Sequence, residues 1–173
     1  MSGIRRFTTD YVAVEDRIRL SLERSDRTVR ILWLTRPLLN KLAARLVERV
    51  AAATPASVST DRPLTSGAQQ RFVQQAAAAS LKPQTPVRSG GSTRQAGVAM
   101  LVTSIGLRDG QGALTIEFKG GDQVLEAVPF TGEALRQWLG VLYKCYCHGG
   151  WGGDFWPGWI TPDRAPTDMA RMN

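Results

Sequence analysis

The fold is decided by the stretch IRLSLERSDRTVRILWLTRPLLNKLAARLVERV, residues 18–50. Its pattern recurs without a gap 96 positions later, in LTIEFKGGDQVLEAVPFTGEALRQWLGVLYKCY, residues 114–146. Apolar residues coincide along both stretches, first in strand-like alternation and then at helical spacing. The strand-like matches are Ile18, Leu20 and Leu22 with Leu114, Ile116 and Phe118. An internal repeat of this kind predicts one supersecondary unit used twice, and hence a pseudo-two-fold protein.

Each repeat should contain a hairpin. Residues 17–23 and 28–34 alternate apolar and polar side chains, which is typical of paired strands. A four-residue turn between them would place six apolar residues on one face: Leu22 with Val29, Leu20 with Ile31, and Ile18 with Trp33. The other face would then carry Arg17, Arg19, Arg30, Leu32 and Leu34.

A helix should follow each hairpin. In the first repeat Thr35 can cap a helix that runs to about Ala52, and in the second Thr131 can cap one from Gly132 to about Cys147. Further strands are expected over 4–14, 98–107, 113–119 and 123–128. The predicted class is therefore α+β, with antiparallel sheets, two main helices packed on one face and a βββα unit used twice.

The length predicts one domain built from two repeats. Repeat one covers about 4–52 and repeat two about 97–147, with an aromatic, glycine-rich tail over 148–173. Residues 54–96 form an insertion. Its part from Ala68 to Leu81 reads as a short helix, and residues 83–94 have the composition of a flexible linker, so we expect partial mobility.

Charge is unevenly distributed along the chain. The formal net charge is +7, with eleven basic and six acidic residues in 1–49, five and one in 50–100, and six and eight in 101–173. Such asymmetry points to a polyanionic partner of the first half. Compositional bias is the alternative explanation, since 18 of the 22 basic residues are arginine.

The sequence predicts a soluble, cytoplasmic protein. No apolar segment follows Arg5 and Arg6 as in a signal peptide, and no apolar run is long enough to span a membrane. The two cysteines lie one residue apart, at Cys145 and Cys147, which argues against a disulfide framework.

Residues that could carry chemistry are few. Only three potential metal ligands lie close together in the sequence, namely Cys145, Cys147 and His148. A structural zinc ion is coordinated by four ligands, usually in two pairs. Neighbouring thiol and imidazole groups at a helix end also make a poor nucleophile and base. Since no phosphate-binding glycine loop is present either, we expect a non-enzymatic protein without metal or cofactor.

Two groups of residues are candidate binding sites. The first is basic: Arg17, Arg19 and Arg30 on one sheet face, with Arg24 and Arg27 at the turn, where guanidinium groups can pair with phosphates. The second is apolar and suits a protein partner: Leu32, Leu34, Trp151, Phe155, Trp156 and Trp159. Packing of the four tail aromatics over the helices is the simpler interpretation of those rings.

The predicted plan of strands followed by one helix, used twice, is similar in outline to single-stranded nucleic-acid-binding folds of the Pur-alpha and Whirly type. In those folds curved antiparallel sheets cradle the strand. The resemblance implies binding of single-stranded RNA or DNA through the basic sheet face. The alternative is a non-catalytic accessory or assembly subunit that docks a larger protein. A homo-oligomer is expected in both cases, because it would cover the half-apolar sheet face.

Overall fold

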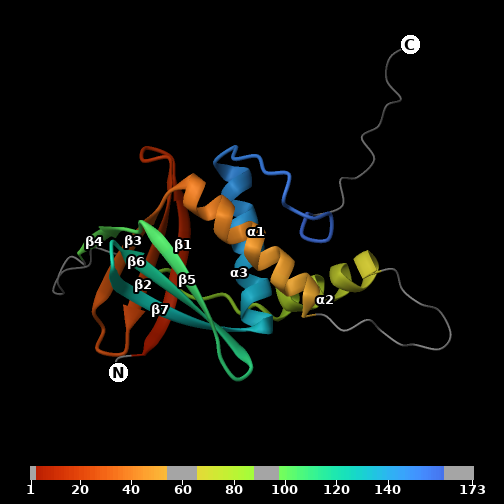
Figure 1. Ribbon diagram of the computed structural model, residues 1–173, viewed down its shortest axis with the longest axis horizontal. Helices are drawn as coiled ribbons and strands as arrows, with labels where there is room; N and C mark the ends of the chain where they lie inside the picture. Colours follow the sequence, from red (N-terminus) through yellow and green to blue (C-terminus); the bar gives the residue numbers. More distant parts are fainter. Residues whose placement is uncertain (1–2, 54–65, 88–97, 162–173) are drawn as a thin grey trace, which may run out of the picture.

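The computed structural model describes residues 3–53, 66–87 and 98–161 of this α+β protein. These residues form two sheets and three helices (Figure 1). The first strands and helix are β1 (Ile4–Val12), β2 (Arg17–Arg24), β3 (Val29–Leu34) and α1 (Arg36–Ala52), followed by α2 (Ser66–Ser80). Then come β4 (Ala99–Leu101), β5 (Ser104–Asp109), β6 (Ala113–Gly120), β7 (Gln123–Thr131) and α3 (Gly132–His148).

The four-stranded sheet has the order β1-β2-β3-β4, and the three-stranded sheet has the order β5-β6-β7. All pairs are antiparallel except β3 and β4. The prediction of one strand over 98–107 is wrong, because the chain changes sheets within it. At the crossing, the Val102 amide donates to the Trp33 carbonyl at 3.0 Å and the Thr103 amide to the Lys119 carbonyl at 2.8 Å.

The predicted register of the first hairpin is also wrong, by one residue. Ile18 lies opposite Leu34 rather than Trp33, and Leu20 lies opposite Leu32. The turn is shorter than expected: the Arg24 amide bonds to the Thr28 carbonyl at 2.9 Å. That leaves three turn residues, the last of which, Arg27, has the left-handed φ of 65° typical of three-residue hairpin loops. The Asp26 carboxylate accepts the Thr28 amide at 2.9 Å and stabilises this turn.

One apolar core joins the two sheets to α1 and α3. Both helices lie on the same side of the sheets, to the right in Figure 1. Trp138 of α3 stacks on Phe130 of β7, with ring centroids 5.0 Å apart, and meets Phe7 of β1 edge-on. Both helices start after the predicted cap residues, and the Thr131 hydroxyl accepts the Ala134 amide at 3.2 Å. Within the described residues no helix is long and apolar enough to cross a membrane.

The helix of the insertion is α2, which packs on α3. Gln74 donates to the Arg136 carbonyl at 3.0 Å, and the Arg136 guanidinium donates to the Gln70 side chain at 2.6 Å. After α2, residues 81–87 run beside β1, where the Val87 side chain is buried. The remainder of the predicted flexible linker lies outside the described residues, as do residues 54–65.

Candidate nucleic-acid interface

The face of the four-stranded sheet that points away from the core is the candidate interface, and is called the outer face below. Alternation and register define it: when Ile18, Leu20 and Leu22 face the core, their neighbours on β2 face outward. The outer face consists of Arg6, Thr8, Asp10, Val12, Arg17, Arg19, Ser21, Glu23, Val29, Ile31, Trp33, Ala99 and Leu101.

Trp33 of β3 lies on the outer face between residues of both neighbouring strands. It pairs across the strands with Arg19 of β2 on one side and with Leu101 of β4 on the other. Its side chain is half-buried, and Leu101 is exposed. Sequence reasoning missed Trp33 because the slipped register placed it in the core. The signal that could have corrected this was the turn, where Asp26 and Thr28 favour a three-residue loop.

Two of the five predicted arginines remain on the outer face. Arg19 contacts Asp10 at 3.5 Å, and Arg17 contacts Glu15 at 3.7 Å. These are long, partly solvated ion pairs, and such pairs contribute only about 0–1 kcal/mol. A phosphate group can therefore replace either carboxylate at little cost.

The other three arginines lie elsewhere. Arg24 and Arg30 reach Glu126 of β7 at 3.3 and 3.1 Å, on the side where the two sheets meet. Only 7% of the Glu126 side chain is exposed, so this contact ties the sheets together. Arg27 is exposed in the turn, and none of the described residues forms an ion pair with it. The structure thus splits the predicted basic cluster into three places.

Leu32 and Leu34 do not share the arginine face. Both side chains are 0% exposed in the core, because the one-residue change of register turns them inward. Their expected surface patch is therefore absent from the described structure. The apolar residues on the outer face are instead Val12, Val29, Ile31, Trp33, Ala99 and Leu101.

The tail aromatics pack against α3 and the turn between β1 and β2. Trp151 is 4% exposed, and its indole donates to Asp16 at 2.7 Å. The ring of Trp156 meets that of Tyr146 edge-on, with centroids 5.2 Å apart. Phe155 contacts the same tyrosine ring, and Trp159 lies 5.4 Å from the Arg136 guanidinium. The structure thus places all four tail rings against the body of the protein.

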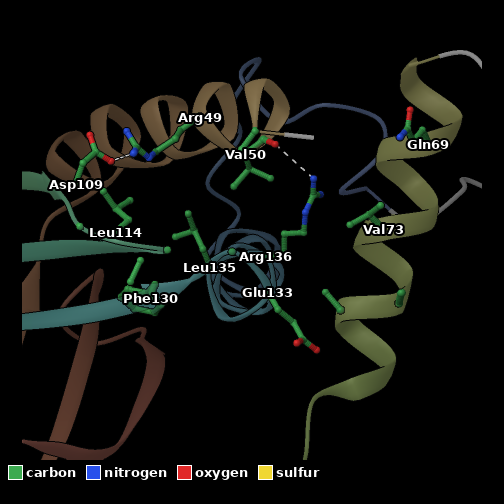
Figure 2. Close-up of a pocket in the computed structure, with 17 residues that line it drawn as sticks. Arg49, Val50, Gln69, Val73, Asp109, Leu114, Phe130, Glu133, Leu135 and Arg136 are labelled. Atoms are coloured by element: carbon green, nitrogen blue, oxygen red, sulfur yellow. Dashed lines mark hydrogen bonds and ion pairs between the residues drawn. The ribbon is translucent and has the colours of Figure 1, made fainter. Parts of the chain in front are cut away.

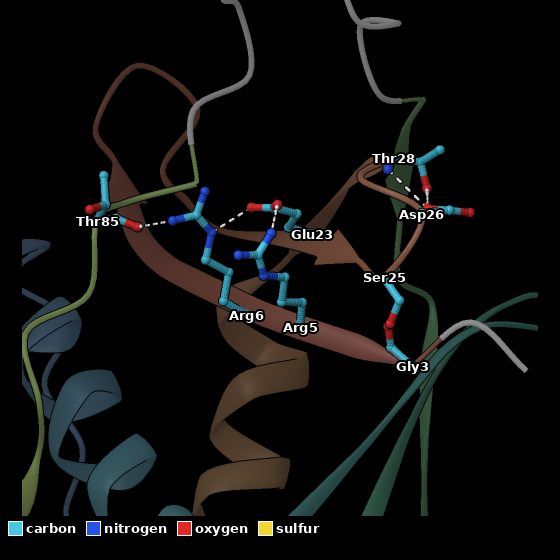
Figure 3. Close-up of polar contacts among 8 residues, drawn as sticks. All are labelled: Gly3, Arg5, Arg6, Glu23, Ser25, Asp26, Thr28 and Thr85. Carbon is cyan, nitrogen blue, oxygen red and sulfur yellow. Dashed lines mark hydrogen bonds and ion pairs between the residues drawn. The ribbon is translucent and has the colours of Figure 1, made fainter.

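Residues 81–87 form a strap along the β1 side of the outer face (Figure 3). The Arg6 guanidinium donates to the Thr85 carbonyl at 3.1 Å, and the Val87 amide donates to the Thr8 hydroxyl at 2.8 Å. Arg5 and Arg6 both contact Glu23. On the outer face Ser21, Glu23 and Ile31 are buried, whereas Arg17, Arg19 and Trp33 are partly exposed and Leu101 is exposed.

A cavity of about 690 Å³ lies between the helices, away from this face. Figure 2 shows that it is bordered by α1, α2, α3 and the turn between β5 and β6. Its lining is mainly apolar, and Arg136 at its edge points toward the Val50 carbonyl, at 3.4 Å. Among the described residues, no group of three or more histidine, cysteine, aspartate or glutamate side chains could hold a metal ion.

Comparison with known proteins yields no relative. No family model matches the chain, and neither a curated protein nor a solved structure shows significant similarity to it.

Proposed function

We propose that this protein binds single-stranded nucleic acid on the outer face, without catalysing a reaction. The observation that carries the proposal is the position of Trp33 directly beside Arg19, on the face turned away from the core. An accessible indole can stack on an unpaired base, and a neighbouring guanidinium can hold the adjacent phosphate. Base stacking on an aromatic side chain contributes about 1–3 kcal/mol.

The proposal favours single strands because stacking on Trp33 needs an unpaired base with a free face. Leu101 extends the apolar surface beyond the indole, while Arg17 extends the positive charge along β2. At the corresponding positions of the three-stranded sheet, Pro129 and Thr115 stand in place of Trp33 and Arg19. There Glu117 contacts Arg108 and Lys119, and Pro129 pairs with Thr115.

The test is fluorescence anisotropy with a labelled mixed-sequence oligonucleotide and nuclease-treated protein at low salt. Trp33→Ala should weaken binding about tenfold, and Arg17→Gln with Arg19→Gln should weaken it further. Arg45→Gln is the matched control, because Arg45 is an exposed arginine of α1 and not part of the outer face. Equal affinities for all of these proteins would refute the proposal.

A second candidate function is docking of a larger protein as an accessory subunit. Two exposed apolar residues at the sheet edge favour it, namely Leu101 beside Trp33 and Val98 just before β4. A stoichiometric protein that co-purifies with the tagged chain, and is lost with Leu101→Asp, would support this function. Retention of that protein by the variant would count against it.

We also propose that the chain is a pseudo-two-fold repeat. Adding 96 to the bounds of β2 and α1 gives those of β6 and α3, and the pairs Ile18–Leu34 and Leu114–Phe130 are related by the same shift. An experimental structure whose halves do not superpose by a rotation close to a two-fold would contradict this. The cytoplasmic location and the homo-oligomeric state remain predictions.

A further inference from the structure

Two polar atoms on the outer face are buried without a hydrogen-bond partner in the described structure, namely Arg19 Nε and Ser21 Oγ. The residues are neighbours on the same face of β2, and Ser21 is 0% exposed. Buried donors are normally paired, because an unpaired one costs about 1–3 kcal/mol. Their coincidence on one face therefore indicates a site that is prepared for an acceptor.

The strap occupies the two polar groups beside them. Thr8 lies opposite Ser21, and its hydroxyl accepts the Val87 amide. The Arg6 guanidinium, one position along the same face, donates to the Thr85 carbonyl. The Thr85 carbonyl oxygen thus accepts a hydrogen bond from an arginine, as a phosphate oxygen does in a nucleic-acid complex.

We propose that a phosphodiester group of the bound strand takes the place of the strap on Arg6 and Thr8, beside Ser21. Arg6, Arg19 and Ser21 then donate to its oxygens, and residues 81–87 move off β1. This inference rests on the proposed function and adds a phosphate subsite and a competing segment to it. The strap leaves β1 readily because its described hydrogen bonds to that strand are two, and Val87 is its one buried side chain.

Two substitutions test the subsite and the strap separately. Val87→Ser removes the apolar anchor of the strap without touching the subsite. It should tighten oligonucleotide binding about fivefold, because displacing the strap then exposes less buried apolar surface to water. Ser21→Ala removes one donor and should weaken binding about fivefold, with no loss of unfolding free energy, since its hydroxyl has no partner to lose. Lys82→Gln is the control within the strap, because its side chain is exposed.

Hydrogen exchange of the strap amides provides a second measurement. If the strap were only structural, binding of an oligonucleotide would not speed up their exchange. In the wild-type protein the Val87 amide is bonded to Thr8, so it should exchange faster once an oligonucleotide is bound. Suppose that Trp33→Ala weakens binding, but the Val87 amide exchanges at the same rate with and without oligonucleotide and neither substitution changes the affinity. The strap and the subsite are then refuted, while the proposed function stands. If the wild-type protein binds no oligonucleotide at low salt, the proposed function itself fails.

Discussion

Arg30 on β3 forms an ion pair with Glu126 on β7 at 3.1 Å, and the two residues stand 96 positions apart. They therefore occupy equivalent positions in the proposed repeats. In a pseudo-two-fold protein, equivalent residues meet only close to the axis. The first half supplies the cation there and the second half supplies the anion. The two equivalent residues therefore attract each other and join the two sheets.

Removal of the shared carboxylate should destabilise the protein. Glu126→Ala removes the charge-assisted contacts that Arg24 and Arg30 share, and we expect a loss of about 2 kcal/mol in unfolding free energy. Urea denaturation followed by tryptophan fluorescence measures it. Glu48→Ala, at an exposed position of α1, should change stability by less than about 0.5 kcal/mol. Equal effects of the two substitutions would contradict an inter-sheet role for Glu126.

Asp16 should make stability depend on acid pH. Hydrogen bonds donated by the Trp151 indole and the Tyr11 hydroxyl lower the pKa of this carboxyl below its ordinary 3.8. A carboxyl with a lowered pKa in the folded state contributes stability above its unfolded pKa, and this contribution is lost as the pH falls through the folded pKa.

The matched variant is Asp16→Asn, because asparagine tolerates the left-handed φ of 47° at this position. The variant should be less stable than the wild type at pH 7, and the difference should shrink as the pH falls below 4. Unfolding free energies measured across this range check it. A difference that stays constant with pH would exclude a role for the Asp16 charge.

Salt dependence should report the number of phosphates held by the outer face. Each phosphate contact to a single strand contributes about 0.7 to the slope of log affinity against log salt. Arg17→Gln with Arg19→Gln should therefore reduce the slope by about 1.4, whereas Trp33→Ala should weaken binding with little change in slope. Anisotropy titrations at several salt concentrations measure both. An unchanged slope in the double arginine variant would exclude these contacts.

The two cysteines should differ in reactivity although they are one residue apart. Burial raises the pKa of the Cys145 thiol to about 11, and its sulfur lies 3.8 Å from the Thr9 carbonyl. Cys147 is exposed. Since the thiolate is the reactive form, a thiol reagent at pH 8 should modify one cysteine quickly and the second only on unfolding. Rapid modification of both in the native protein would show that the α3 contact with β1 opens.

The helices were the most predictable part of the fold. The buried residues of α1 recur every three or four positions, because one side of the helix must face the core whatever its partner. The cap residue Thr131 was predictable for a similar reason, since its hydroxyl bonds to an amide only three residues away. The ends of hairpin strands were nearly as predictable, because they depend on the few residues of the turn between them.

The candidate site was less predictable, because it depends on register. A turn shorter by one residue exchanges Trp33 for Leu34 between the surface and the core. Both side chains are apolar, so their sequence pattern fits either register. The contact of Arg24 with Glu126 joins residues 102 positions apart and has no local signal at all.

The sequence by itself determined the α+β class, the positions of the two main helices and the excess of positive charge in the first half. These properties follow from local periodicity, capping and composition. Tertiary structure alone decided which arginines remain on the outer face, which pair with the second sheet, and where Trp33 points. The reason is physical: a strand presents its two faces alternately, so a one-residue shift in its pairing moves every side chain of that strand to the opposite face.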